Sequence, residues 1–200
     1  MNQFGAVLLC GGQSSRMGRS KAWLPVGGTT MLQRVVGILS EVAHPIVVVA
    51  AVGQSLPSLP SNVIVAHDEI DGKGPLAGLA AGLAAMGKQT NTIYLSACDV
   101  PFLNATFVQR VVALLDETHV IAVPRIDGHF HPLAAVYRVS IHETVAQLLT
   151  SDRLRMKDLF ALVATREITH AELASVDPEL QSLRNINTPE DYEACRTTLG

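Results

Sequence analysis

The sequence predicts a three-layer α/β/α protein with a mostly parallel central sheet. Short apolar runs of strand length recur along the chain, and they read as near-continuous Val, Ile and Leu instead of alternating with polar residues. Strands of this composition are buried on both faces, as in parallel sheets that carry helices on either side. Segments with helical spacing separate the runs. No internal repeat or linker interrupts the pattern, so we expect one domain over residues 1–200.

Local patterns place the elements. Strands are expected over residues 5–10, 45–52, 62–66, 92–97, 119–124 and 132–139. Helices are expected over residues 30–40, 75–86, 105–116 and 189–199. Pro75 and Pro189 stand at first-turn positions, Asn104 is a predicted N-cap, and Thr188 with Asp191 resembles a capping box. The Pro- and Ser-rich segment 53–62 is expected to be a surface loop.

Composition excludes several classes of protein. Of the 200 residues, 48% are apolar and 16% are charged, which is typical of an ordered globular chain. The net charge of -3, without a Lys/Arg block, provides no basic face for a nucleic acid. No secretory signal is visible, and no apolar run reaches the ~18 residues that would span a bilayer. We therefore expect a cytoplasmic protein with no nucleic-acid or membrane partner. Cys10, Cys98 and Cys195 are expected to be small buried hydrophobic residues.

The first candidate site follows the first expected strand, in VLLCGGQSSRMGRSK (7–21). Ligands of parallel sheets bind at the carboxyl ends of the strands, where this loop begins. Gly11 and Gly12 lack a Cβ, so their backbone N–H groups can approach an anion or a flat base closely. Arg16 and Lys21 are able to neutralise phosphate oxygens. The spacing matches neither the P-loop nor the dinucleotide fingerprint, and a glycine turn with two solvated cations is the alternative.

The second candidate site is Asp99, which follows a buried strand in SACDVP. Burying a carboxylate at the end of such a strand costs free energy unless a cation or a hydrogen-bond donor pairs with it. Mg²⁺ would do so, since it is commonly held by one or two carboxylates together with substrate phosphates and water. An aspartate that caps a turn is the alternative. Together the two loops indicate a nucleoside triphosphate with its metal on Asp99, and transfer of a phosphoryl or nucleotidyl group.

These segments resemble a known family. LLCGGQSSRMGRSK is similar to the pattern LAGGxSxRMGxxK of the molybdenum cofactor guanylyltransferases and their nucleotidyltransferase relatives, and GPLAG, CDVP, HPLAAVYR and NINTPED continue the match in the same order. The resemblance runs from Val7 to about Tyr192. It implies a Rossmann-like nucleotidyltransferase fold and Mg²⁺-dependent transfer of GMP from GTP to the terminal phosphate of molybdopterin or Mo-molybdopterin, with release of pyrophosphate. It also implies transient contact with proteins that mature molybdoenzymes.

The resemblance implies roles for single residues. The positions that seat guanine and begin the phosphate loop correspond to Leu9, Cys10, Gly11 and Gly12. Lys21 matches the lysine that contacts the GTP phosphates, and Asp68 matches an acidic position associated with the nucleotide. Asp99 matches the aspartate shared by the nucleotide and Mg²⁺. The expected catalytic residues are therefore Arg16, Lys21 and Asp99.

Two further segments are expected at the second substrate by the same resemblance. His131 matches the family's HP motif, and Asn185 and Asn187 match the NINTPED segment. Considered alone, Asp127, His129 and His131 form a metal-like cluster without a visible fourth ligand, and a turn with exposed polar side chains is preferred. For the asparagines, turn and capping chemistry before the last helix is the alternative.

The chain departs from the family pattern at a few places, and other functions stay open. Cys10 stands where alanine is usual, Ser20 stands where aspartate is frequent, and an asparagine found after the second strand of some members has no counterpart here. The alternatives are a relative that uses CTP or a sugar-phosphate acceptor, and a non-catalytic nucleotide-binding accessory protein. Gly11 favours GTP, because cytidylyl relatives tend to carry alanine there and the missing methyl leaves room for a purine. The presence of Asp99, the expected metal ligand, favours an enzyme over a non-catalytic binding protein.

Overall fold

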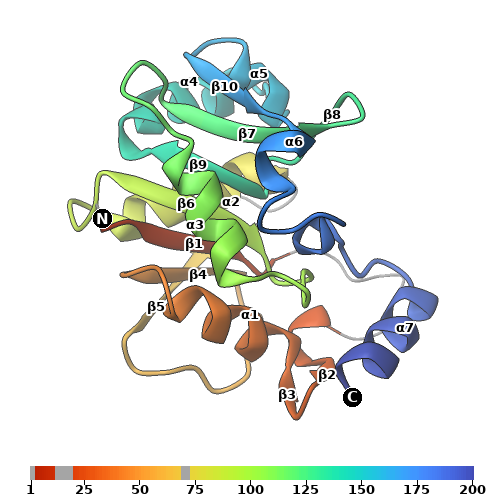
Figure 1. The fold of residues 1–200 in the computed structure, drawn as a ribbon. Coiled ribbons are helices and arrows are strands. Elements are labelled where there is room, and N and C mark those ends of the chain that lie inside the picture. The colour runs from red at the N-terminus through yellow and green to blue at the C-terminus, as the bar shows by residue number, and fades with distance from the viewer. Residues whose placement is uncertain (1–2, 12–19, 69–72) are drawn as a thin grey trace.

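A computed structural model of the chain describes residues 3–11, 20–68 and 73–200 (Figure 1). Its centre is an eight-stranded sheet with the strand order β10-β7-β9-β6-β1-β4-β5, in which β8 pairs with β7. The strands of this sheet are β1 (Gly5–Leu9), β4 (Ile46–Ala51), β5 (Val63–Asp68), β6 (Thr92–Ala97), β7 (Ile121–Ile126), β8 (His129–Phe130), β9 (Ala134–Arg138) and β10 (Thr165–Ile168). A separate two-stranded sheet consists of β2 (Pro25–Val26) and β3 (Thr29–Thr30).

The α-helices of the described residues lie mostly between the strands in sequence. They are α1 (Met31–Ser40), α2 (Gly74–Met86), α3 (Ala105–Ala113), α4 (His142–Thr150), α5 (Met156–Phe160), α6 (His170–Leu173) and α7 (Pro189–Leu199). Short 3-10 helices are η1 (Lys21–Trp23), η2 (Val139–Ile141) and η3 (Gln181–Leu183). None of the helices in these ranges combines the length and the apolar character that crossing a membrane would require.

The sheet is mostly parallel, which confirms the predicted fold class. β1 pairs in parallel with β4 and β6, β4 pairs in parallel with β5, and β7 pairs in parallel with β10. β9 runs antiparallel to both β6 and β7. The apolar run that becomes β9 looks like the parallel runs, because it is equally buried on both faces, and so composition does not reveal its direction.

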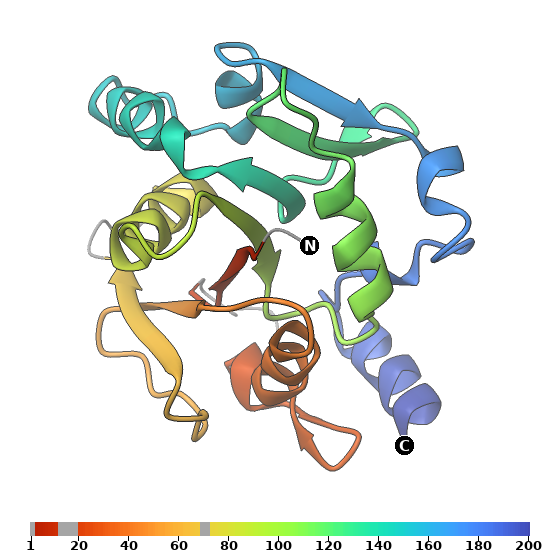
Figure 2. The same cartoon turned by 60° about the vertical axis from the view of Figure 1, so that its left-hand side comes forward.

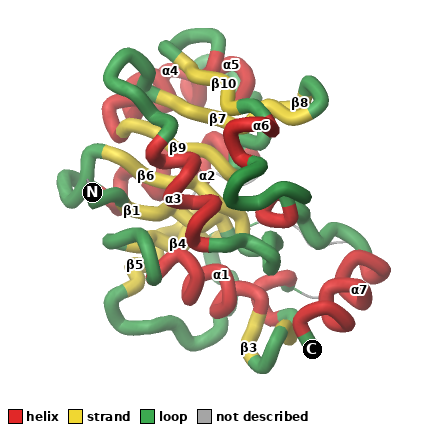
Figure 3. Tube along the Cα trace, in the orientation of Figure 1, coloured by secondary structure: helices red, strands yellow, loops and turns green. Residues whose placement is uncertain are grey.

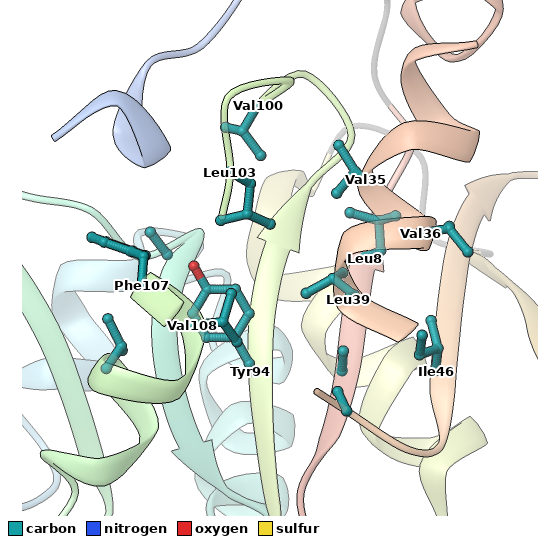
Figure 4. Packing of buried hydrophobic residues seen from close by; sticks show 14 of the residues in the cluster. Leu8, Val35, Val36, Leu39, Ile46, Tyr94, Val100, Leu103, Phe107 and Val108 are labelled. Carbon is teal, nitrogen blue, oxygen red and sulfur yellow. The ribbon is translucent and has the colours of Figure 1, made fainter. Parts of the chain in front are cut away.

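Helices cover both faces of the sheet (Figure 1, Figure 2). On one face, α1, α3 and α6 bury their apolar side chains against β1, β4, β6 and β9. On the other face, α2, α4 and α5 pack against the opposite side chains of the same sheet. Figure 4 shows the first of these layers, where Leu8 of β1 faces Val35 and Leu39 of α1, and Tyr94 of β6 lies beside Phe107 and Val108 of α3.

The predicted helix starts are confirmed by their caps. The Thr30 side chain accepts a hydrogen bond from the Gln33 backbone N–H in a capping box, and Asn104 accepts one from the Phe107 N–H at 2.7 Å. Thr188 and Asp191 form the predicted capping box of α7, with Pro189 in the first turn. These side chains satisfy N–H groups that a helix start would otherwise leave without partners.

The helix predicted over residues 105–116 ends earlier, at Ala113. Asp116 Oδ1 instead accepts hydrogen bonds from the backbone N–H groups of Thr118 and His119, at 2.9 and 3.1 Å. Hydrogen bonds from Thr118 and His119 hold the pKa of the Asp116 carboxyl well below its usual range. An aspartate that bonds to the backbone two or three residues ahead favours a turn over a helix.

The segment 52–62 connects β4 to the parallel neighbour β5 without a helix, and we call it the strap (Figure 3). The predicted surface loop is confirmed. Leu56 and Leu59 anchor the strap by packing against the core on the α1 face. Gln33 of α1 donates from Nε2 to the Ser58 carbonyl at 2.8 Å. The strap is therefore fixed to the layer of helices beneath it.

Three cysteines behave as predicted. Cys10, Cys98 and Cys195 are buried free thiols. Cys10 and Cys98 follow the neighbouring strands β1 and β6, and Cys195 lies in a small separate core between α7 and β2. This small core also contains Ile186, so it holds the segment that precedes α7 against the start of α1.

Candidate active site

Several sequence-predicted site residues come together at the carboxyl edge of the sheet. Leu9 at the end of β1 pairs with Ala97 at the end of β6, and Ala51 at the end of β4 pairs with Asp68 at the end of β5. The residues that follow these strands therefore lie along one edge. This is the edge at which ligands of parallel sheets bind.

At this edge four side chains form a cluster, in which two asparagines hydrogen-bond to an ion pair. Lys21 Nζ lies 2.7 Å from Asp99 Oδ2 and 2.8 Å from Asn187 Oδ1. Asn185 Nδ2 donates to the other carboxylate oxygen, Asp99 Oδ1, at 2.8 Å. Three segments that are far apart in sequence thus contribute to one cluster. We call these four residues, Lys21, Asp99, Asn185 and Asn187, the Lys21–Asp99 cluster.

Backbone contacts hold the cluster in place. The Ile186 N–H donates to the Asp99 carbonyl at 2.9 Å, which fixes the NIN segment against the end of β6. Arg34 of α1 donates from Nε to the Pro101 carbonyl at 2.7 Å, on the loop that follows Asp99. Asp191 accepts from the Asn187 N–H at 3.1 Å through its capping carboxylate. Asn187 is thus positioned by the capping carboxylate of α7, as the alternative interpretation expects, and both asparagines also contact the predicted catalytic residues.

The positive charge of Lys21 and the negative charge of Asp99 form a partly buried ion pair. The Lys21 and Asp99 side chains are only 18% and 14% exposed, so water screens their attraction less than it screens a surface pair. Lys21 begins η1, and the contact of its ammonium with Asp99 excludes the alternative of a solvated cation for this residue. The cation that pairs with Asp99 in the structure is therefore Lys21. An ammonium has three donors, and the described residues accept two of them.

The nucleotide-side residues lie at the end of β1. Leu9 packs against Gly78 of α2, where an added Cβ would lie 3.0 Å from Leu9 Cδ2, so this glycine of GPLAG lets the helix approach the strand closely. A Cβ added at Gly11 would lie 3.4 Å from the Ala51 nitrogen, against the end of β4. Gly12 and Arg16 lie outside the described residues. Asp68 is the last residue of β5, at the same edge.

Cys10 and Cys98 form a pair of thiols beneath this edge. A hydrogen bond with Cys10 and burial both raise the pKa of the Cys98 thiol well above its usual value. A thiol held in this way stays protonated at neutral pH and is a poor nucleophile. Cys98 therefore packs beneath the site as a small apolar group beside the buried Cys10.

The second-substrate candidate His131 lies on the same side of the sheet. Ala134 at the start of β9 pairs with Ser96 of β6, so His131 and Asp99 both lie three residues beyond that pair. Burial, with His129 nearby, lowers the pKa of His131. The ring is therefore neutral at pH 7 and offers one donor and one acceptor. Among the described residues, no hydrogen bond joins it to the Lys21–Asp99 cluster.

The segment around His129 forms a tight hairpin. Asp127 and Gly128 have positive φ angles of 49° and 79° between β7 and β8, and His129 Nδ1 lies 2.9 Å from the Asp127 carbonyl. Asp127 and His129 are exposed in this turn, as the preferred interpretation predicts, whereas His131 is half-buried. Within residues 3–11, 20–68 and 73–200, no group of three His, Cys, Asp or Glu side chains could hold a metal ion by itself.

Gln54 of the strap is a site-edge residue that the sequence did not single out. Its Nε2 donates to the Cys10 carbonyl at 3.0 Å, and its Oε1 accepts from the Ala51 N–H at 2.9 Å. The sequence places it in a Pro- and Ser-rich loop, where a glutamine carries no functional signal. Its position after the predicted strand 45–52 was the one available clue, because residues there face the carboxyl edge.

Comparisons with known proteins identify the family. A family model described as MobA-like NTP transferase domain matches residues 6–168. The chain is 36% identical over 195 residues to a probable molybdenum cofactor guanylyltransferase of Mycobacterium avium, covering 96% of this chain and 94% of that protein. It is 32% identical over 200 residues to a molybdenum cofactor guanylyltransferase of Desulfosudis oleivorans, covering 100% of this chain and 97% of that protein.

Solved structures share the fold. A molybdopterin-guanine dinucleotide biosynthesis protein A from Archaeoglobus fulgidus superposes with a TM-score of 0.78 at 20% identity, covering 98% of both chains. A 2-C-methyl-D-erythritol 4-phosphate cytidylyltransferase from Thermus thermophilus superposes with a TM-score of 0.74 at 16% identity, covering 98% of this chain and 99% of that chain. The predicted nucleotidyltransferase fold is confirmed. With the family match and the relatives at 32–36% identity, the chain belongs to the molybdenum cofactor guanylyltransferases, a group of MobA-like NTP transferases.

Proposed function

We propose that residues 1–200 act as one nucleotidyltransferase domain that transfers GMP from GTP to the terminal phosphate of molybdopterin or Mo-molybdopterin. The observation that carries the proposal is the Lys21–Asp99 cluster, which stands at the ligand-binding edge of the sheet in a chain of this family. A cation and a carboxylate held 2.7 Å apart provide both charges that a triphosphate with its metal requires.

The nucleotide would lie across the ends of β1 and β5. Leu9, Cys10, Gly11 and Gly12 are proposed to seat the guanine and the start of the triphosphate, with Asp68 at the same edge. Lys21 and Arg16 are proposed to contact phosphate oxygens, where their charge is needed as the leaving pyrophosphate develops. Within residues 3–11, 20–68 and 73–200, Lys21 uses two of its three donors, for Asp99 and Asn187, and the third is proposed to make this contact.

The second substrate would approach from the side of His131, Asn185 and Asn187. Asn185 and Asn187 each use one end of the amide to hold the cluster. The Asn185 Oδ1 and the Asn187 Nδ2 make no hydrogen bond to the part of the chain that the structure describes, and we propose that they contact the ligand. The terminal phosphate of molybdopterin is already an anion near neutral pH, since its second pKa is about 6. Its oxygen attacks the α-phosphorus of GTP, and the bond from that phosphorus to the pyrophosphate oxygen breaks. No general base is needed, so positioning and charge stabilisation carry the reaction.

The described residues fit a Mg²⁺ ion that substrate phosphates help to hold. Asp99 offers one carboxylate, and its Oδ2 together with the Asn187 Oδ1 already holds a cationic group, the Lys21 ammonium. One carboxylate suffices for Mg²⁺ when phosphates and water complete the octahedron. When bound, Mg²⁺ would neutralise charge on the α-phosphate and the leaving pyrophosphate. Asp99 is the residue proposed to hold it.

The proposal is tested by incubating the protein with Mg²⁺, molybdopterin and each of the four labelled nucleoside triphosphates. We expect label to enter the pterin product, with stoichiometric pyrophosphate, from GTP alone. Binding can be followed separately through Trp23, the single tryptophan, which lies two residues after Lys21. Transfer from CTP in preference to GTP would identify a cytidylyltransferase, and binding of GTP without any transfer would identify an accessory protein. A cytoplasmic location and contact with molybdoenzyme maturation proteins stay predictions.

A further inference from the structure

Gln54 links the ends of two neighbouring strands. Its side-chain amide accepts from the N–H of Ala51, the last residue of β4, and donates to the carbonyl of Cys10, directly after β1. The distances are 2.9 and 3.0 Å, so both ends of the amide make hydrogen bonds of ordinary length. The nitrogen also lies 3.8 Å from the Cys10 sulfur. The amide is thereby fixed in one orientation.

The contact with Cys10 determines the direction of the Gly11 N–H. The Cys10 carbonyl and the Gly11 N–H belong to one planar trans peptide, in which the two groups point in opposite directions. With the carbonyl held by Gln54, and with the Cys10 N–H bonded to the Val49 carbonyl at 2.8 Å, this peptide cannot rotate freely. Gly11 is exposed, and its N–H makes no hydrogen bond to another described residue.

The strap holds Gln54 in this position from several sides. Trp23 of η1 donates from its indole nitrogen to the Ser55 carbonyl at 3.0 Å, next to Gln54. Gln33 secures the strap again at Ser58. The turn that carries Gln54 is closed by its own N–H, which donates to the Ala51 carbonyl at 3.1 Å. A side chain supported in this way loses little further entropy when a ligand binds.

We infer that Gln54 is a positioning residue that aims the Gly11 N–H at an acceptor oxygen of the bound nucleoside triphosphate. The inference rests on the proposed function, which places the nucleotide at Leu9 to Gly12. Gln54 acts through the Cys10 peptide and makes no contact with the nucleotide itself. Its loss weakens nucleotide binding because the N–H is then free to turn away, so binding must restore an orientation that the native protein already has.

The test compares Gln54→Leu and Gln54→Glu with the wild type by calorimetric titration with GTP. Leucine removes both hydrogen bonds at similar volume, and glutamate places a carboxylate oxygen against the Cys10 carbonyl. We expect each variant to raise the Kd and the KM for GTP about tenfold, the scale of one well-placed hydrogen bond. We expect kcat to change less than KM. In ¹⁵N-labelled protein, GTP should shift the Gly11 amide signal in the wild type and shift it less in the variants.

The matched control is Gln89→Leu, which removes the hydrogen bond of a glutamine to the Met86 carbonyl at the end of α2, away from the strap and from the carboxyl end of β1. It should leave the GTP affinity and the Gly11 shift unchanged. Normal GTP affinity and a normal Gly11 shift in a folded Gln54 variant would overturn the inference, and Gln54→Glu decides the case if Gln54→Leu does not fold. If the wild type prefers CTP, the proposed function fails, and the same comparison made with CTP still tests Gln54.

Discussion

Lys21 and Asp99 illustrate how a residue's surroundings change what its type alone suggests. As a sequence feature, Asp99 is a carboxylate after a buried strand that needs a cation. In the structure both of its oxygens are occupied, one by Lys21 and the other by Asn185. Each partner therefore depends on the others for its orientation, and a substitution at either charge acts on the whole cluster.

Asp99→Asn should abolish the Mg²⁺-dependent part of GTP binding and nearly all guanylyl transfer. The amide nearly preserves volume but removes the negative charge that Mg²⁺ prefers. If Asp99 were an unpaired buried charge, this substitution would raise the free energy of unfolding. Because it is paired with Lys21, we expect a loss of about 1–2 kcal/mol in the free energy of unfolding.

The measurement is GTP affinity with and without Mg²⁺ in both proteins. Glu167→Gln serves as a control, since Glu167 lies on the edge strand β10 in an exposed pair with Arg125. If Mg²⁺ strengthens GTP binding equally in the wild type and Asp99→Asn, Asp99 is not the metal ligand.

Lys21→Ala should lower turnover by roughly a hundredfold, the scale of losing one group that stabilises developing charge. It also leaves Asp99 with Asn185 alone, so the melting temperature should fall by a few degrees. Lys88→Ala is the matched control, because Lys88 is exposed and lies just beyond α2, at the opposite edge of the sheet. Steady-state kinetics measures the turnover of both variants. Equal turnover in Lys21→Ala and Lys88→Ala would show that Lys21 does not belong to the site.

At the scale of elements, β6 and β9 form an antiparallel pair that places one tyrosine on each face of the sheet. Tyr94 of β6 lies in the core under α3, and Tyr137 of β9 lies in the core under α2 and α4. Tyr137 donates to the Pro132 carbonyl at 2.8 Å and so holds the segment that follows His131. The Tyr94 hydroxyl has no hydrogen-bond partner among the described residues (Figure 4).

The two tyrosines should therefore respond differently to removal of the hydroxyl. Tyr94→Phe removes a buried polar group without a partner and should leave the free energy of unfolding unchanged or raise it. Tyr137→Phe removes a hydrogen bond and leaves the Pro132 carbonyl without it, at a cost of about 1 kcal/mol. Urea unfolding of both variants measures the difference. A loss at Tyr94 as large as that at Tyr137 would indicate that an ordered water binds the Tyr94 hydroxyl.

At the scale of the whole molecule, stability should depend on the protonation of His131. Burial lowers its pKa in the folded state below the usual 6.5, so the unfolded chain binds the proton more tightly. The free energy of unfolding should therefore be undiminished above pH 6.5. It should fall as the pH drops below 6.5, until the pH reaches the lowered folded pKa.

His131→Gln should flatten this dependence by removing the titrating group. Urea unfolding at pH 7.5, 6 and 5 in both proteins gives the comparison. We expect the wild type to lose more stability than the variant on acidification. Parallel curves would show that the His131 ring titrates alike in the folded and unfolded chain.

The sequence by itself determined the layers of this protein and pointed to most residues of the candidate site. Buried parallel strands require near-continuous apolar runs, so β1, β4, β5 and β6 were visible as composition, and the caps of α3 and α7 were visible as single residues. The shorter elements were not, because β10 has four residues and α4 buries only Val145 and Leu148. Asp99 was visible because a carboxylate after a buried strand is costly without a partner, and Lys21 was visible as a cation in a glycine-led loop that can neutralise phosphate oxygens.

Only the tertiary structure decided how these residues are connected. Nothing local in NINTPED indicates that Asn185 and Asn187 reach Asp99 and Lys21, since that contact depends on α7 packing beside β2 and on the Ile186 N–H binding the Asp99 carbonyl. The role inferred for Gln54 depends likewise on the strap returning to β1. Local patterns report which groups a chain must bury or cap, whereas contacts between distant segments arise from packing, for which a single sequence carries no periodic signal.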